Sequence, residues 1–428
     1  MAARLMAQFQ GLIGIAGMML LAWLLSENRG QRPGWFWLAG ALLLQVAIAL
    51  VATRVPLIWT AVAQVNHVVS AIETATLAGS SYMFGYLGGA AIPFVLKPAE
   101  GPPLVIAFQI LPLIIVFSAL SALLWHWGVL RVVVNGLSWA LQRTLGVNGV
   151  VGLAGGAGIF LGVVETPLVL RAWLGGVRRG DLFAIMVMTM ATISGAILVL
   201  YASTLGKTLP DAAGHMIVAS LLTLPAALLV ARLMVPWPDI EAGGAGKSSA
   251  DPVLIYDGSM DAIVRGAMEG MQLVLAVIAI IITAFALVNL VDQLLALLPP
   301  LLDDGPLTLR RLLGLVFAPA MWAIGVPWAQ ADAAGSLMGT KAILNEYVAY
   351  LDLAALPAGT FSPRSLLIVT YALCGFANLA SVGLIVSTIA TLAPERRAEV
   401  AGLGLKSWLA GNMATLMSGA MIGLVTPV

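Results

Sequence analysis

Charge and cysteine are both scarce in this sequence. Only 10% of its 428 residues are charged, whereas a water-soluble domain carries about 25%. Hydrophobic residues make up 61% of the chain, so a soluble globule would expose far too much apolar surface. The net charge of only +1 argues against a nucleic-acid-binding protein, and the composition argues against a disordered one. The single cysteine, Cys374, excludes an internal disulfide and a zinc site built from cysteines.

Long apolar runs dominate what is present. A transmembrane helix needs about 20 mostly apolar residues. The clearest candidates are residues 9–26, 35–52, 104–125, 182–204, 216–234, 271–295, 365–392 and 401–425. We expect the first run to be a span rather than a cleaved signal peptide, because it is too long and starts too late. The sequence therefore predicts an all-α polytopic membrane protein with about eight transmembrane helices.

Two further apolar stretches, 146–174 and 316–353, are interrupted by glycine and proline. Each has a glutamate deep inside it, Glu165 and Glu346 respectively. Non-helical backbone at membrane depth is tolerated only where it is buried in protein or lines a cavity. We therefore predict two re-entrant hairpins.

Each predicted hairpin precedes a span that polar or small residues interrupt. The interruption at 192–195 begins about 27 residues after Glu165, and the one at 378–381 begins about 32 residues after Glu346. Interrupted segments at corresponding places in two halves are typical of a repeat-built transporter whose site lies near the bilayer midplane.

Changes in composition suggest how the chain is divided. Residues 55–80 are amphipathic, and we expect them to lie along a membrane interface. We expect N-terminal spans with this interfacial helix at 1–103 and a first transport half with hairpin 1 at 104–235. A polar linker with an interfacial helix follows at 236–270. The second half, at 271–428, has a scaffold span, hairpin 2 and C-terminal spans. Three arginine pairs are expected on the cytoplasmic side, at 178–179, 310–311 and 396–397.

The two buried glutamates are the first candidates for function. A carboxylate inside a span costs about 2.5–3.5 kcal/mol on insertion scales, so Glu165 and Glu346 should face the protein interior or an aqueous cavity. Either could bind a ligand or could cap the exposed amides of a half-helix. Asn378 and Ser381 share one helical face and can bond a polar neutral ligand, although such residues also link helices to each other. The histidines lack partners at metal-ligand spacing, and no serine has a convincing base, so we expect neither a metal site nor an enzyme.

Several motifs resemble the concentrative nucleoside transporter family. The strongest are Thr-Tyr-Ala-Leu-Cys-Gly-Phe-Ala-Asn at 370–378, Gly-Val-Pro-Trp at 325–328 and Leu-Asn-Glu-Tyr-Val-Ala-Tyr at 344–350. Weaker similarity extends the match over roughly 104–428. The resemblance implies a homotrimer in the inner membrane whose protomers combine a scaffold with a mobile, inverted-repeat transport domain. It implies nucleoside import by proton or sodium symport with elevator-type movement, and no cofactor. A nucleoside-recognition or gate protein, or a transporter of another small polar solute, is the alternative.

The same resemblance assigns roles to individual residues. It implies that Glu346 binds the ribose hydroxyls together with Asn378 and Ser381, and that Phe376 lies beside the ligand. A carboxylate suits this role because it only accepts hydrogen bonds and can receive two hydroxyl protons.

At the nucleobase end the resemblance places Glu165 and Ile197. The family pattern has Gln-Thr before this glutamate, whereas this chain has Val163 and Val164. Each lost hydrogen bond is worth about 0.5–1.5 kcal/mol, so we expect a more apolar base pocket and leave the base preference open.

The resemblance also locates the coupling ion. Sodium-coupled members use an Asn and a Ser side chain, which correspond here to Gly158 and Thr192, together with backbone oxygens at Leu161 and Ile193. Glycine offers only its carbonyl, so a sodium site would be weakened. We favour a coupling proton on one of the two hairpin glutamates, because a buried carboxylate takes up a proton more readily than an exposed one.

Overall fold

The computed structural model describes residues 2–94, 105–206, 208–237, 255–298 and 306–427. Within these ranges the chain forms α-helices and two short 3-10 helices, without any β-strand. The predicted all-α class is therefore confirmed. The glycine- and serine-rich run 243–249 of the predicted linker lies outside the described residues.

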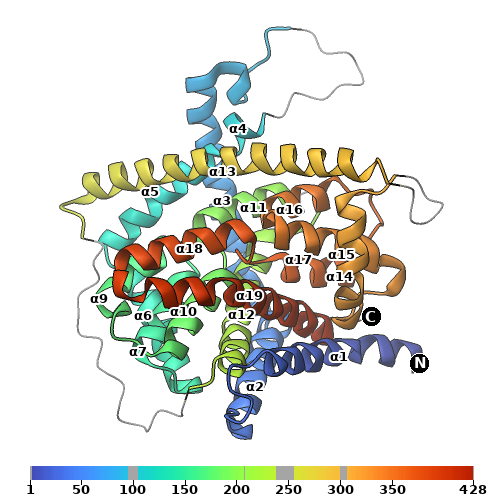
Figure 1. The fold of residues 1–428 in the computed structure, drawn as a ribbon. Coiled ribbons are helices and arrows are strands. Elements are labelled where there is room, and N and C mark those ends of the chain that lie inside the picture. Colours follow the sequence, from blue (N-terminus) through green and yellow to red (C-terminus); the bar gives the residue numbers. More distant parts are fainter. Residues whose placement is uncertain (1, 95–104, 207, 238–254, 299–305, 428) are drawn as a thin grey trace.

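The helices fall into three groups along the chain (Figure 1). The N-terminal group is α1 (Ala2–Leu24), α2 (Trp35–Arg54), α3 (Pro56–Phe84), η1 (Gly85–Gly88), α4 (Ile106–Gln109), α5 (Pro112–His126) and α6 (Val129–Leu145). The middle group is α7 (Gly149–Gly158), α8 (Glu165–Val169), α9 (Arg171–Leu174), α10 (Arg179–Ala191), α11 (Gly195–Leu205) and α12 (Ala212–Met234). The C-terminal group is α13 (Ser259–Leu295), α14 (Leu309–Ala323), α15 (Trp328–Ile343), α16 (Glu346–Ala355), α17 (Pro363–Leu373), α18 (Leu379–Leu392), η2 (Pro394–Arg396) and α19 (Arg397–Val425).

Among the described residues, six segments are long and apolar enough to cross a membrane. They are Trp35–Arg54, Ile106–His126, Arg179–Leu205, Ala212–Met234, Ser259–Leu295 and Pro394–Val425. The predicted run 365–392 is divided into α17 and α18, and the described apolar part of α1, Gln8–Leu24, is shorter than a full span. The predicted count of eight spans therefore stays a prediction.

The spans differ in what surrounds them. The segment Arg179–Leu205 is completely enclosed by protein, and α12 is nearly so. By contrast, α13 packs mainly along α5 at one edge of the molecule and exposes most of its length, including Leu275 and Ile282 (Figure 1). An apolar helix without a protein cover requires lipid around it, whereas an enclosed one lies in the interior of a helical bundle.

The same order of elements occurs twice. Helices α7 and α8 form hairpin 1, which precedes the broken span α10–α11 and then α12. Helices α15 and α16 form hairpin 2, which precedes the broken span α17–α18 and then α19. The predicted pairing of each glutamate hairpin with an interrupted span is therefore confirmed.

A polar residue starts the helix that follows each interruption. The side chain of Ser194 accepts from the backbone N–H of the third residue on and begins α11, while Asn345 and Asn378 do the same for α16 and α18. Asn148 likewise begins α7. Such caps satisfy amides that lack a partner at a helix start, so a span can break and resume inside a protein at little cost.

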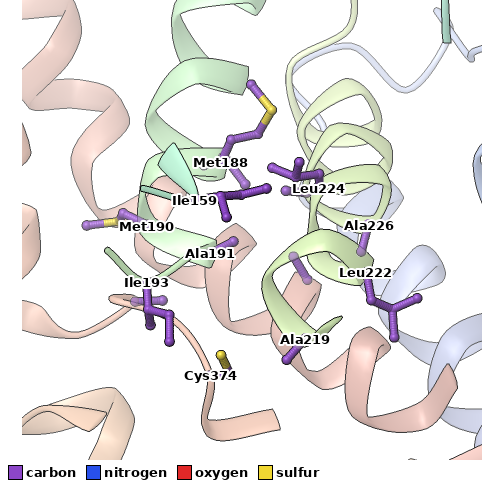
Figure 2. Packing of buried hydrophobic residues seen from close by; sticks show 14 of the residues in the cluster. Ile159, Met188, Met190, Ala191, Ile193, Ala219, Leu222, Leu224, Ala226 and Cys374 are labelled. Carbon is purple, nitrogen blue, oxygen red and sulfur yellow. The ribbon is translucent and has the colours of Figure 1, made fainter. Parts of the chain in front are cut away.

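The two broken spans meet at their breaks. The backbone N–H of Phe376 donates to the carbonyl of Thr192 at 3.2 Å. Gly375 permits this approach, because a Cβ there would lie 2.7 Å from the Ala191 carbonyl oxygen. Figure 2 shows the surrounding core, in which Ala191 and Cys374 from the two breaks pack with residues of α12. The interruptions in the two halves thus form one junction.

Helices α13 and α3 include the two stretches that we expected to lie along a membrane interface. Helix α13 runs without a break across the boundary that we placed at residue 270, so the residues before that boundary continue a span rather than form a separate interfacial helix. The stretch 55–80 is helical as part of α3, whose later half projects beyond α13 in Figure 1.

The three arginine pairs make ion pairs in two separate groups. Arg179 and Arg396 both pair with Glu399, so the first and third pairs lie together. Arg310 instead pairs with Asp352, and its neighbour Leu309 donates its backbone N–H to Asp292 near the C-terminal end of α13. The common cytoplasmic side of the three pairs stays a prediction.

Candidate functional site

The tip of hairpin 1, between α7 and α8, presents Glu165. Glu165 is the first residue of α8, and its carboxylate folds back toward the turn that precedes this helix. A Cβ added at residue 162 would lie 2.3 Å from one carboxylate oxygen, so a larger residue there would displace the side chain. A negative charge at this position is favoured by the dipole of the helix start. The same side chain also lines a cavity.

The tip of hairpin 2 presents Glu346, the first residue of α16. The hydroxyl of Tyr201 donates to one carboxylate oxygen at 2.5 Å, and the side-chain amide of Asn378 donates to the other at 2.9 Å. The amide oxygen of Asn378 accepts from the backbone N–H of Ser381 at 2.8 Å. Asn378 therefore both starts α18 and bonds the carboxylate, so the two roles that the sequence left open for it coexist.

An aromatic group supports this carboxylate. The Tyr201 ring stacks on Tyr347 with a centroid separation of 5.9 Å and packs against Tyr350 at 4.9 Å. Tyr201 belongs to α11 in the first half, whereas the other two tyrosines belong to α16 in the second. The carboxylate and its hydroxyl donor thus join the two halves beside their common junction.

A cavity lies between the two hairpin tips and the two breaks. All eight residues that the sequence proposed for substrate binding line it: Val163, Val164, Glu165, Ile197, Glu346, Phe376, Asn378 and Ser381. They come from four separate parts of the chain, and only the fold brings them together. Glu346, Asn378 and Ser381 are each at most 5% exposed, so their polar atoms face this enclosed space rather than the surface.

The cavity has a polar end and an apolar wall. The polar end is formed by Glu346, Asn378 and Ser381. On another side it is lined by Leu273, Val277 and other apolar residues of the peripheral helix α13. Such a space can hold a molecule with hydroxyl groups at one end and a flat apolar face at the other.

The four positions proposed for a coupling ion lie around the first break. The Thr192 hydroxyl bonds the carbonyls of Gly158 and Met188, both at 3.0 Å. Ile193 follows Thr192 in the break, and Leu161 lies in the hairpin turn after Gly158. All four positions come from the hairpin and the break that the sequence paired, but the only side-chain oxygen among them is that of Thr192.

Comparisons with known proteins identify the fold. Family models described as the C-terminus and the N-terminus of Na+ dependent nucleoside transporters match residues 215–423 and 13–87, and a model described as nucleoside recognition matches 107–208. The nucleoside permease NupC of Helicobacter pylori is 30% identical over 96% of both chains. An uncharacterized transporter of Bacillus subtilis, YutK, is 34% identical over 97% of this chain and 98% of its own.

The chain belongs to the concentrative nucleoside transporter family. Its fold matches the solved structure of CNTnw in an inward-facing, substrate-bound state, with a TM-score of 0.85 at 31% identity over 98% of both chains. An intermediate state of a CNTnw variant matches with a TM-score of 0.87 over 98% of this chain and 99% of the other. The family consists of multi-pass membrane transporters and not of enzymes.

Sequence reasoning missed three parts of the site in this family member. Tyr201 lies four residues after Ile197, so the two side chains share one face of the helix. A tyrosine on that face of an otherwise apolar span was a usable signal for the site. Asn345 lines the cavity next to Glu346 and starts α16. The wall from α13 carries no local signal, because its apolar residues look the same whether they face lipid or a cavity.

Proposed function

We propose that this chain imports nucleosides across the inner membrane by proton symport. The observation that carries the proposal is the position of Glu346, whose carboxylate faces the cavity with the amide of Asn378 at 2.9 Å. Each carboxylate oxygen can accept more than one hydrogen bond, so both can receive ribose hydroxyls while they keep their present donors. The name of the Helicobacter pylori permease and the family descriptions support the same substrate class.

The cavity favours strict recognition of the sugar and loose recognition of the base. A site built to bond a hydroxyl rejects an analogue that lacks it, whereas an apolar pocket separates similar shapes only weakly. Apart from Glu165, the base end has the apolar residues Val163, Val164 and Ile197 together with the α13 wall. Loss of one ribose hydroxyl should therefore reduce affinity more than exchange of a purine for a pyrimidine.

Proton coupling is favoured by the chemistry at the first break. Sodium prefers several oxygen ligands, but Gly158 supplies only a carbonyl, which the Thr192 hydroxyl already bonds at 3.0 Å. The carboxylates of Glu165 and Glu346 both face the cavity and can each carry one proton with the substrate. Uptake should therefore follow a pH gradient and be indifferent to sodium.

Movement of the hairpins past α13 would give alternating access. The cavity lies between the hairpin tips and α13, so a displacement of the hairpin domain along α13 would carry the site across the membrane. Solved structures of CNTnw include inward-facing, intermediate and outward-facing states, and this chain matches them with TM-scores of 0.84 to 0.87. We further propose that α13 belongs to a scaffold and that three protomers assemble, as the family resemblance implies.

Uptake into proteoliposomes tests the proposal. Tritiated adenosine and uridine are offered under an imposed pH gradient, an imposed sodium gradient, and neither. We expect accumulation with the pH gradient alone. Strict dependence on sodium would refute proton coupling, and no accumulation of any nucleoside under either gradient would refute nucleoside symport.

Variants identify the proton carrier. Glu165→Gln and Glu346→Gln are compared for accumulation against a gradient and for exchange of internal for external nucleoside. The variant that retains exchange but loses accumulation has lost the coupling proton. If both variants accumulate nucleoside as the wild type does, neither glutamate carries the proton.

A recognition or gate protein is the second candidate. The nucleoside-recognition model matches residues 107–208, which include hairpin 1 and the first broken span. Such a protein would bind nucleosides or equilibrate them without concentrating them. Binding without gradient-driven accumulation in the same proteoliposomes would favour it. Accumulation of another hydroxylated solute, with no nucleoside competition, would instead indicate a different substrate.

A further inference from the structure

A fully buried lysine lies behind the hairpin 2 carboxylate. Lys341, in the last turn of α15, has 0% of its surface exposed. Its ammonium group donates to the side-chain oxygens of Thr415 at 2.8 Å and Asn412 at 2.9 Å, and to the carbonyl of Ala372 at 3.4 Å. Its three N–H donors therefore have three oxygen acceptors, which come from α17 and α19.

The surroundings of this ammonium are those of a bound cation. Burial of an unpaired charge costs several kcal/mol, and the three oxygens that accept from Lys341 are all neutral. The ammonium lies at the C-terminal ends of both α15 and α17, where the helix dipoles are negative. Glu346 lies at the N-terminal end of α16, where the dipole is positive, and it interacts electrostatically with Lys341.

A chain of contacts leads from the ammonium to the site. Asn412, which accepts from Lys341, donates its side-chain amide to the carbonyl of Ala377 at 2.9 Å. The next residue is Asn378, whose amide donates to Glu346. Lys341 therefore contacts, through Asn412, the non-helical segment 374–378 between α17 and α18. Asn378, the last residue of this segment, bonds Glu346.

In the first half a different group joins the corresponding helix ends. There the C-terminal ends of α7 and α10 are joined by the Thr192 hydroxyl, which bonds the carbonyls of Gly158 and Met188. A neutral hydroxyl thus occupies the place where the second half has an ammonium. The junction of the second half therefore has a positive charge at this place, where the junction of the first half has the neutral Thr192 hydroxyl.

We propose that Lys341 is a positioning residue that acts as a tethered cation. It fixes hairpin 2 against the α17–α18 break and α19, and it holds Glu346 with its carboxylate oxygens directed to the substrate hydroxyls. The assignment of those hydroxyls to a nucleoside rests on the proposed function. Because the cation is covalently attached, the geometry of this half should not depend on sodium, potassium or any other ion in solution.

Lys341→Met tests the charge at nearly constant shape. We expect the Kd for tritiated uridine, measured with purified protein in detergent, to rise by about 10-fold or more. Lys406→Met is the matched control, because Lys406 lies on α19 with its side chain 40% exposed and pairs with Glu27 far from the cavity. Its Kd should stay within about twofold of wild type. An equally small change for Lys341→Met would overturn the proposal.

A double-mutant cycle separates positioning from a merely structural role. If Lys341 acts through Glu346, then Lys341→Met should add less than about twofold to the Kd of Glu346→Gln. If the two losses simply multiply, the proposal is wrong. Chemical rescue gives an independent readout: ethylammonium should restore uridine binding to Lys341→Ala, and the neutral analogue ethanol should not. Equal rescue by both, or rescue by neither, would overturn the role of the charge.

If Lys341→Met does not fold, Thr415→Val tests the same proposal. Thr415→Val removes one acceptor and leaves the ammonium in place, so it should raise the Kd for uridine by about threefold to 10-fold. An unchanged Kd in this variant would then overturn the proposal. Failure of the wild-type protein to bind any nucleoside would instead count against the proposed function, because the inference predicts a difference only between variants.

Discussion

Glu346→Gln is the substitution with the clearest expected effect. The carboxylate accepts from Tyr201 at 2.5 Å and from Asn378 at 2.9 Å. A glutamine has nearly the same shape but only one accepting oxygen, and its amide nitrogen would place N–H groups against one of these donors. The variant therefore loses both the charge and half of the accepting capacity that two ribose hydroxyls require.

The magnitude follows from the two substrate hydrogen bonds. A hydrogen bond to a charged group contributes about 1.5–3 kcal/mol, and one between neutral groups about 0.5–1.5 kcal/mol. Loss of about 1–1.5 kcal/mol at each of two bonds weakens binding by about 2–3 kcal/mol, which raises the Kd by about 30- to 150-fold. Folding should suffer less, because the substitution also removes a buried charge, and we expect the Tm to change by less than about 3 °C.

Uridine binding and thermal unfolding of the same purified samples measure both effects. Asp352→Asn is the matched control, because Asp352 lies on the same helix, α16, and pairs with Arg310 away from the cavity. It should leave the Kd unchanged. A folded Glu346→Gln protein with a Kd within about twofold of wild type would refute the assignment of Glu346 to the sugar.

Three further predictions concern other parts of the chain. Tyr201→Phe removes the hydroxyl that orients Glu346, so the Kd for uridine should rise by about fivefold to 10-fold, measured by equilibrium binding. Gly162→Ala places a methyl group where the Glu165 carboxylate lies, so it should displace this flexible side chain from its place at the cavity and reduce uptake into proteoliposomes at little cost in stability. A hydrogen bond from Arg179, with a further contribution from a lysine, lowers the pKa of Glu27 from 4.5 to about 2. The stabilisation from this loop carboxylate is therefore complete above pH 4.5 and is lost as the pH falls toward 2, which thermal unfolding at a series of pH values should detect.

Controls exist for each of these three predictions. Tyr86→Phe changes a tyrosine that is 39% exposed in η1 and should leave binding unaltered. Gly136→Ala places a methyl group in open space on α6, so it should leave uptake unaltered. Glu27→Gln should flatten the loss of Tm between pH 4.5 and 2, and an unchanged slope in this variant would show that other carboxylates cause the loss. Equal behaviour of a test variant and its control would contradict the corresponding prediction.

Much of the site could be predicted because its residues break local rules. Glu165 and Glu346 are acids in apolar stretches, and Asn378 interrupts a span, so each conflicts with its neighbours unless it has a special role. The prediction failed where no such conflict exists. Tyr201 and Leu273 fit their helices without difficulty, and only their position beside the cavity distinguishes them from ordinary span residues.

The sequence by itself determined the class of the protein, because a chain with 10% charge and repeated apolar runs of about 20 residues is typical of helices in lipid. It also determined where the spans break, because the polar caps and glycines at those places are local features. Only the tertiary structure decided that the two breaks meet, that Tyr201 from one half bonds Glu346 from the other, and that Lys341 lies behind this carboxylate. These contacts join residues tens to hundreds of positions apart, and their geometry depends on how whole helices pack rather than on any local pattern.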